Sequence, residues 1–300
     1  MNALKYRVLL ICLCLACAWC VQPANAASKS SSRFSVTDDL GRIVTLGQPA
    51  KRVVSLAPHL TENVFAIGAG GTLVGVSQYS DYPAAAQQIT QVGDYQSINV
   101  EQVIALQPDV ILAWVDGGNQ QALNHLAGMG IPIYWSRPAT IPAIAKELSR
   151  LGVLTGHQKQ AAQVVDDFNH RLQTLQNSAH NSPVSVFYQV WAKPLQTLNN
   201  NSLIGAVITL CGGRNVFGDA PAVVAQVDRE AVLLANPEVI LGTHAQGEAP
   251  TWKADWLPWR TITAVAKQHI YSIEADVLSR HTPRVLQGAQ QVCNYLSEAD

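Results

Sequence analysis

From Arg52 onward, short apolar runs alternate with segments whose apolar residues recur at helical spacing. The first strand-like runs lie at residues 52–56, 73–77, 109–114 and 131–135. Helical periodicity marks residues 61–69, 99–106 and 119–130. Thr61 and Asn99 open the first two of these segments, and both residue types are favoured helix N-caps. This alternation predicts a parallel sheet covered by helices.

The pattern changes between Ile141 and about His180, where no strand-like run occurs. Apolar residues recur there at helical spacing and are interrupted only near Gly152 and Gly156. Because this stretch is much longer than an ordinary helix, it predicts a long helical connector with a break.

After Pro183 the alternation resumes. Strands are expected at 184–191, 238–243 and 269–276, and helices at 202–213, 228–235 and 282–299. Ser202 is the expected N-cap of the first of these helices, and Pro283 is expected in the first turn of the last. The chain therefore contains a second α/β half.

One sequence motif occurs in both halves. NVEQVIALQPDVILAW, which begins at Asn99, has the same form as QVDREAVLLANPEVILGT further along, and a constant offset of 129 pairs Glu101 with Glu230 and Asp109 with Glu238. We therefore predict an α/β fold of two Rossmann-like lobes joined by one long rigid helix, with a ligand cleft between the lobes. The predicted divisions are a signal peptide (1–26), a leader and N-terminal edge segment (27–51), an N-terminal lobe (52–140), a linking helix (141–181) and a C-terminal lobe (182–300).

The first 26 residues have two cations, Lys5 and Arg7, then an uncharged apolar run and the ending Ala-Asn-Ala. This is the pattern of a secretory signal peptide. A lipoprotein with lipid on Cys17 or Cys20 is the alternative, but neither cysteine follows a suitable run of Leu and small residues. Export through the inner membrane predicts a periplasmic protein.

Removing this leader changes the formal charge from −1 to −3, because it takes away two cations and no anion. No basic surface for nucleic acid is expected. Cys211 and Cys293 are then the only cysteines left. In an oxidising compartment they most simply form one disulfide, with two unpaired buried thiols as the alternative.

Residues that follow the predicted strands are the candidates for ligand contact. They are Pro58, His59, Tyr79, Tyr82, Trp114, Asp116, Trp191, His244, Asp276, Arg280 and His281. An aromatic-rich lining with few charges favours a large, flat, partly apolar ligand, although any one of these rings could simply pack at a sheet edge.

The chemistry of these residues does not favour catalysis or a metal centre. His59, His244 and His281 lie in different loops without metal-ligand spacing, so no protein metal site or cofactor is expected. No phosphate-binding loop or nucleophile elbow occurs, and the two glycine-rich runs, IGAGG and CGGRN, are interpreted as helix C-caps. We predict that the protein is not an enzyme; a cleft enzyme would need an activated nucleophile or an acid and base pair.

Several segments resemble the periplasmic cobalamin-binding proteins of ABC importers. They are VVSLAPHLTENVFAIGAG, GVSQYSDYP, INVEQVIALQPDVILAW, VFYQVW, LCGGRNVF and QQVCNYL, in this order along the chain. This family belongs to the helix-linked binding proteins that also carry haem and iron-siderophores. The resemblance covers essentially the whole chain after the leader.

The resemblance implies a corrinoid held between two lobes and delivered by a monomer to a membrane permease. Tyr79 matches a ligand-contacting tyrosine, Trp114 a cleft aromatic, and Cys211 and Cys293 a disulfide pair. Glu101 and Glu230 match two surface glutamates that dock onto permease arginines. The full predicted ligand-binding set is Pro58, His59, Tyr79, Trp114, Trp191, Asp276 and Arg280.

The chain departs from the cobalamin binders after the last strand, where it reads ADVLSRH. Val277 and Leu278 replace aromatic residues there, and Gln196 and Val224 stand where bulky rings are expected. The departures concern the identity of the ligand, so haem or a ferric siderophore, with His59 or a tyrosine on its metal, is the alternative cargo.

Overall fold

The computed structural model describes residues 34–177 and 183–299, which belong to one compact unit. The predicted signal peptide, and the possible lipid sites at Cys17 and Cys20, lie outside the described residues. Within the described residues, no helix is long and apolar enough to cross a membrane.

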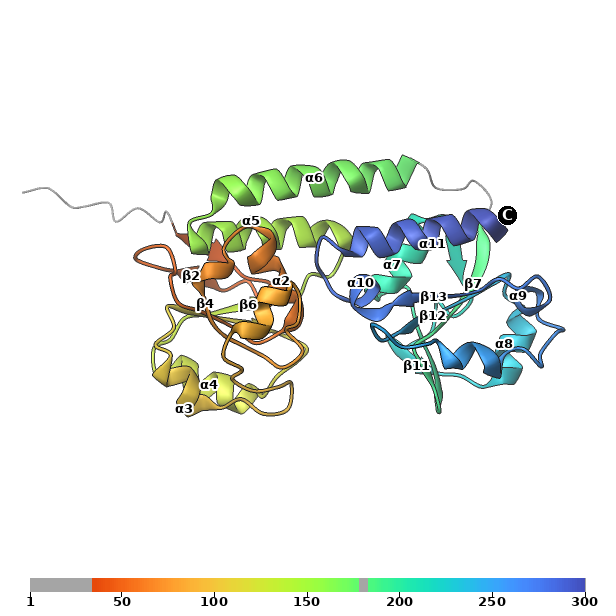
Figure 1. Ribbon diagram of the computed structural model, residues 1–300, viewed down its shortest axis with the longest axis horizontal. Helices are drawn as coiled ribbons and strands as arrows, with labels where there is room; N and C mark the ends of the chain where they lie inside the picture. The colour runs from red at the N-terminus through yellow and green to blue at the C-terminus, as the bar shows by residue number, and fades with distance from the viewer. Residues whose placement is uncertain (1–33, 178–182, 300) are drawn as a thin grey trace, which may run out of the picture. The chain divides into compact units, whose positions relative to one another are not determined.

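Two four-stranded parallel sheets organise the fold (Figure 1). The first contains, in order across the sheet, β4 (Leu73–Val76), β3 (Val53–Ser55), β5 (Val110–Trp114) and β6 (Ile133–Ser136). The second contains β10 (Gly213–Asn215), β7 (Val184–Gln189), β12 (Val239–His244) and β13 (Ile270–Glu274). By chain order within each half, both sheets have the strand order 2-1-3-4, so the repeat predicted from the sequence extends to the topology.

The remaining described strands form two small antiparallel sheets. One is the hairpin β1 (Ser35–Thr37) and β2 (Ile43–Thr45); the other joins β11 (Val224–Gln226), β9 (Leu195–Leu198) and β8 (Trp191–Ala192).

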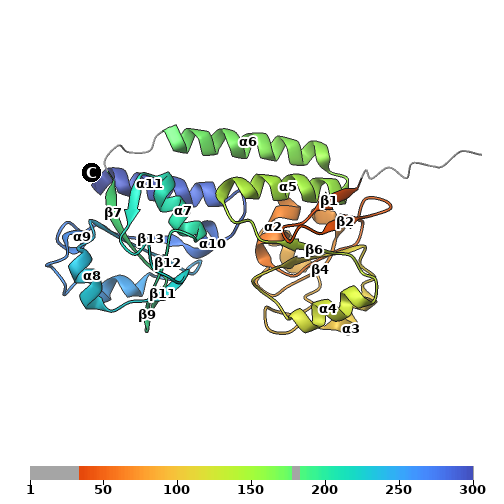
Figure 2. The same cartoon turned by 180° about the vertical axis from the view of Figure 1, so that it is seen from behind.

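Helices cover both faces of each parallel sheet (Figures 1 and 2). Those of the first half are α2 (Pro58–Ala66), α3 (Val100–Ala105), α4 (Gln120–Gly128), α5 (Ile141–Thr155) and α6 (Gln158–Asn177), with 3₁₀ turns η1 (Gly70–Thr72) and η2 (Ala84–Gln88). Those of the second half are α7 (Leu203–Leu210), α8 (Arg229–Ala235), α9 (Thr263–Ala266), α10 (Ala275–Ser279) and α11 (Val285–Ala299), with η3 (Thr251–Asp255).

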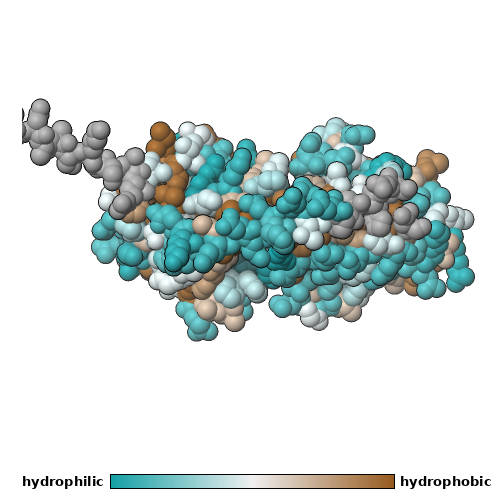
Figure 3. Space-filling model, turned by 90° about the horizontal axis from the view of Figure 1, so that it is seen from above, coloured by the Kyte–Doolittle hydropathy of each residue, from teal (hydrophilic) through white to brown (hydrophobic). Residues whose placement is uncertain are grey.

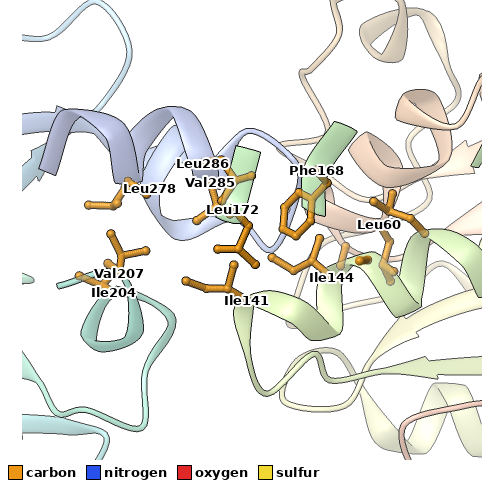
Figure 4. Packing of buried hydrophobic residues seen from close by; sticks show 14 of the residues in the cluster. Leu60, Ile141, Ile144, Phe168, Leu172, Ile204, Val207, Leu278, Val285 and Leu286 are labelled. Atoms are coloured by element: carbon orange, nitrogen blue, oxygen red, sulfur yellow. The ribbon is translucent and has the colours of Figure 1, made fainter. Parts of the chain in front are cut away.

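Strand residues alternate between two cores, as a sheet buried on both faces requires. In β5, Val110 and Leu112 face the side of α2 and α5, whereas Ile111 and Ala113 face the side of α3 and α4. The apolar cluster on the first of these sides continues through α5 and α6 to α7, α10 and α11 of the second half (Figure 4). One hydrophobic core therefore spans both sheets.

The connector consists of two helices packed side by side, α5 and α6 (Figure 1). The break lies at Gly156, which ends α5 in the left-handed conformation with φ of 75°. Gly152 lies inside α5, where an added Cβ would come within 2.5 Å of Ala161. It therefore serves the close packing of the two helices. The shared core crosses residues 140 and 182, so the packing does not divide the chain at these positions. The domain boundaries there remain a prediction.

The outer surface of α6 faces solvent. Figure 3, which looks onto this side of the molecule, shows a largely hydrophilic face. The polar positions of α6 therefore lie outward while Phe168 and Leu172 lie in the core.

Three local expectations were wrong. The first helix begins at Pro58 with Ala57 as N-cap, not at Thr61, because a proline at the first helical position sacrifices no hydrogen bond. The strand expected to reach residue 276 ends at Glu274, and α10 follows it. The last helix starts at Val285, so Pro283 precedes it.

Other local expectations are confirmed. The side chains of Asn99 and Ser202 accept hydrogen bonds from the first turns of α3 and α7. Cys211 and Cys293 form a disulfide that joins α11 to the end of α7.

Candidate binding cleft

A cavity lies where the two parallel sheets direct their carboxyl ends. In each sheet the strand order reverses beside the first strand of that half, at β3 and β5 in one and at β7 and β12 in the other. Such switch points leave a crevice beyond the strand ends. Trp114 ends β5 and Thr243 is the penultimate residue of β12, and both line the cavity.

This cavity has a volume of about 520 Å³ and a mixed lining. Its walls are aromatic, aliphatic or neutral polar apart from one ion pair, Asp116 with Arg137. The lining residues are Trp114, Asp116, Arg137, Pro138, Ala139, Tyr188, Val190, Leu198, Asn201, Ser202, Leu203, Ile204, Val223, Thr243, Ser279 and His281. Trp114, Asp116 and His281 are thus brought together as the sequence predicted.

A second cavity of about 820 Å³ adjoins it, since Val190 and Thr243 line both. Trp191, His244 and Trp252 lie in its wall. Trp191 is 61% exposed, and His244 is held by a 2.8 Å hydrogen bond between its Nδ1 and the Ser272 hydroxyl. The two cavities together form a wide cleft along the end of the second sheet.

Behind the Trp114 wall lies a buried histidine. The ring of His59 packs edge-on against Trp114, at 5.5 Å between centroids, and against His281, at 5.9 Å. Its Nε2 has no hydrogen-bond partner among the residues that the structure describes. Burial, helped by the nearby His281 and Arg280, lowers the pKa of His59 to about 3, so the ring is neutral at neutral pH.

Four other predicted site residues meet in a charge network. The Arg280 guanidinium donates to Asp81 at 2.8 Å and to the Tyr79 carbonyl at 3.2 Å, and it pairs with Asp276 at 2.9 Å. The Arg284 guanidinium lies 3.7 Å over the Tyr82 ring. None of these residues lines either cavity.

The network is centred on Glu62, which is 3% exposed. Arg284 donates two hydrogen bonds to its carboxylate, at 2.8 and 2.9 Å, and Arg280 lies 3.7 Å away. Glu62 belongs to α2 of the first half, whereas both arginines lie beside α10 and α11 of the second. The ion pairs therefore tie the two halves together.

A second buried carboxyl, Glu147 of α5, lies nearby. It accepts hydrogen bonds from the Ser136 hydroxyl and, at 2.8 Å, from the Asn63 amide. The same amide donates to the His281 carbonyl at 3.0 Å. Burial raises the pKa of Glu147 to about 7, so its charge changes near neutral pH.

Metal ligands are sparse in the cleft. Within residues 34–177 and 183–299, no group of three or more His, Cys, Asp or Glu side chains could hold a metal ion.

The family profile described as periplasmic binding protein matches residues 53–277. The chain belongs to this family. A vitamin B12-binding protein from Yersinia pestis (strain Pestoides F) is 39% identical over 251 residues, which are 83% of this chain and 88% of the relative.

Solved structures of periplasmic binding proteins share the fold. The periplasmic vitamin B12 binding protein BtuF of Vibrio cholerae has a TM-score of 0.77 at 38% identity, covering 84% of this chain and 98% of that one. The periplasmic heme-binding protein RhuT from Roseiflexus sp. RS-1 has a TM-score of 0.74 at 20% identity, covering 83% and 99%. The second similarity concerns the fold alone.

The departures that the sequence showed lie in two parts of this binding protein, α10 and the small sheet of β11, β9 and β8. Val277 and Leu278 are buried in α10 and line neither cavity. Val224 is half exposed on β11, where it pairs with Leu198 of β9, and Gln196 lies further along β9, opposite Gln226. The replacement of aromatic residues by Val277 and Leu278 therefore affects the core packing of α10 more than the wall of the cleft.

The two paired glutamates occupy equivalent positions on the binding protein. Glu101 and Glu230 lie exposed in the first turns of α3 and α8. The side chains that cap these helices are Asn99 and Asp228. Helix capping is thus performed by other residues, and both glutamates point a carboxylate to solvent.

Glu62, Arg284 and Glu147 were not predicted from the sequence. The sequence contains only a weak indication that the two glutamates are buried. Each one interrupts an apolar helical run, at a spacing that places it on the buried side of the helix. Their partners come from distant parts of the chain.

Proposed function

We propose that this protein captures a cobalamin-type corrinoid in the cleft and delivers it to the permease of an ABC importer. The observation that carries the proposal is the 39% identity, over most of both chains, with a protein named for vitamin B12 binding. Family membership places the protein among substrate-binding transport proteins, and we propose that it performs no catalysis.

The cleft has the properties that a corrinoid needs. Trp114 presents aromatic surface, and Val190, Leu198 and Val223 present aliphatic surface. A large ring system gains most from such apolar contact, with a few polar groups fixing its orientation. Two adjoining cavities give space beyond that of a ligand of ordinary drug size.

The roles of the predicted ligand contacts divide by position. Trp114 and Trp191 are proposed to contact the ligand directly, because they line the two cavities. Pro58 and His59 lie at the start of α2, and we propose that His59 supports the Trp114 wall because the two rings pack edge-on. Tyr79, Asp276 and Arg280 line neither cavity, and we propose that they contact the ligand at the rim of the cleft.

The proposal also includes export and docking. We propose that residues 1–26 direct the chain to the periplasm, and that a monomer presents Glu101 and Glu230 to two arginine sites of the permease.

Titration of the purified protein with cyanocobalamin and with haemin tests the ligand class. We expect saturable binding of cyanocobalamin, and Trp114→Ala should weaken it by about tenfold or more because an aromatic wall is lost. Tyr95→Ala, which removes an exposed ring outside both cavities, should leave affinity unchanged. Saturable haemin binding without any cyanocobalamin response would instead support the haem alternative.

A further inference from the structure

We propose that His281 coordinates the metal of the bound tetrapyrrole, taking the axial position that a water occupies in aquocobalamin. This inference rests on the proposed function and assigns one residue a role in selecting the form of the ligand.

The ring of His281 is placed for this role. It lines the cavity in which Trp114 and Ser279 also lie. The backbone carbonyl of His281 is fixed by the Asn63 amide, whereas neither ring nitrogen has a hydrogen-bond partner within the part of the chain that the structure describes. A ring nitrogen is therefore available to a ligand.

The charge state of the ring is also suitable. Burial lowers the pKa of His281, although the nearby Asp116 carboxylate opposes the shift. Coordination requires an imidazole nitrogen with a free lone pair, and the direction of this shift favours that form of the ring.

The neighbourhood favours a metal that arrives with its own ligands. Since no cluster of three metal-binding side chains occurs in the described residues, one imidazole here cannot hold a free transition metal in a complete shell. A corrin or porphyrin supplies four equatorial nitrogen atoms and needs only axial donors. A single free imidazole on an aromatic wall matches that requirement.

His244 is less suited, because its Nδ1 is already bonded to Ser272 and it lies in the neighbouring cavity. The coordination step is a ligand exchange: the cobalt–oxygen bond to water breaks, a cobalt–nitrogen bond to His281 forms, and water leaves without oxidation or reduction.

Two corrinoids that differ at the axial position test the inference. Aquocobalamin has an exchangeable water, whereas cyanocobalamin has a tightly held cyanide. We expect the visible absorption spectrum of aquocobalamin, but not that of cyanocobalamin, to change on binding. His281→Gln should abolish this change and weaken aquocobalamin binding by about tenfold or more relative to cyanocobalamin. His125→Gln, on the exposed side of α4, is the matched control and should leave both unchanged.

The outcomes separate the two proposals. An unchanged aquocobalamin spectrum, or a change that survives in His281→Gln, overturns the role of His281 while cyanocobalamin binding still supports the proposed function. A change lost only in His244→Gln also overturns it. If neither corrinoid binds, the proposed function itself fails.

Discussion

At the scale of single residues, the least expected feature is the burial of Glu62 beside two arginines. Removing one partner of a buried ion pair is costly, because the remaining charge stays desolvated without compensation. The two hydrogen bonds from Arg284 to this carboxylate also join α2 to the chain just before α11.

We therefore predict that Glu62→Gln lowers the free energy of unfolding by roughly 3–5 kcal/mol, measured by urea denaturation. The matched control is Asp167→Asn, which removes an exposed pair with Arg171 on α6 and should cost less than about 0.5 kcal/mol. Equal effects of the two changes would contradict the structural role of Glu62.

Glu147 gives a prediction for pH dependence. Its pKa is about 7 in the folded protein and 4.5 as the ordinary value, so the folded chain binds more protons than the unfolded chain between these pH values. The contribution of this carboxyl to stability is therefore present at low pH and is lost as pH rises through this window.

We predict that Glu147→Gln, which cannot titrate, lacks this loss. As pH rises from about 4.5 to about 7, the free energy of unfolding of the wild type should fall relative to that of the variant. Denaturation curves at a series of pH values measure it, and a difference that stays constant with pH would show that Glu147 does not titrate there.

Sequence reasoning identified the residues that follow strands but not these buried charges. Trp114 and His281 could be predicted because each comes after a strand-like run, and the carboxyl ends of parallel strands share an edge. Arg284 lies 222 residues from Glu62, and no local pattern connects them. Asp276 and Arg280 were both predicted as site residues, but neither their ion pair nor the partners of Arg280 in the first half were visible in the sequence.

At the scale of elements, the repeat is more complete than the sequence showed. Gln107 and Asn236, again 129 residues apart, both have positive φ before a proline, where the right-handed helical conformation is disfavoured. The next carboxylates also act alike: Asp109 accepts from the backbone N–H of Arg52, and Glu238 accepts from that of Ser185. Each fixes the start of the neighbouring first strand.

The element most sensitive to a small change is the turn between α5 and α6. Gly156 combines positive φ with close approach, since an added Cβ would lie 2.9 Å from Pro49. We predict that Gly156→Ala lowers the free energy of unfolding by about 1 kcal/mol or more. Gly128→Ala is the control: Gly128 ends α4, and a Cβ added there would meet no atom of the described residues within 4 Å. This change should be neutral or stabilising. Thermal unfolding of both variants compares them, and equal melting temperatures would contradict the prediction.

At the scale of the whole molecule, the docking surface proposed above is separate from the proposed ligand cleft. The exposed Glu101 and Glu230 lie outside both cavities. We predict that the double variant Glu101→Ala, Glu230→Ala keeps its affinity for cyanocobalamin within about twofold. In cells that depend on this protein for uptake of cyanocobalamin, the same variant should reduce that uptake. The single variants should have intermediate uptake if each glutamate meets one arginine site. A large loss of affinity in the double variant would contradict a docking role.

The hydrophobic core that passes from the first sheet through α5 and α6 to the second has a consequence for unfolding. A pair of lobes with separate cores would melt independently, each with its own transition. Here Ile144, Phe168 and Leu172 share one buried cluster with Val207 and Leu286, so opening either half exposes the apolar surface of the other. Calorimetry should record a single cooperative transition, with equal calorimetric and van't Hoff enthalpies, and neither half alone should persist as a folded species.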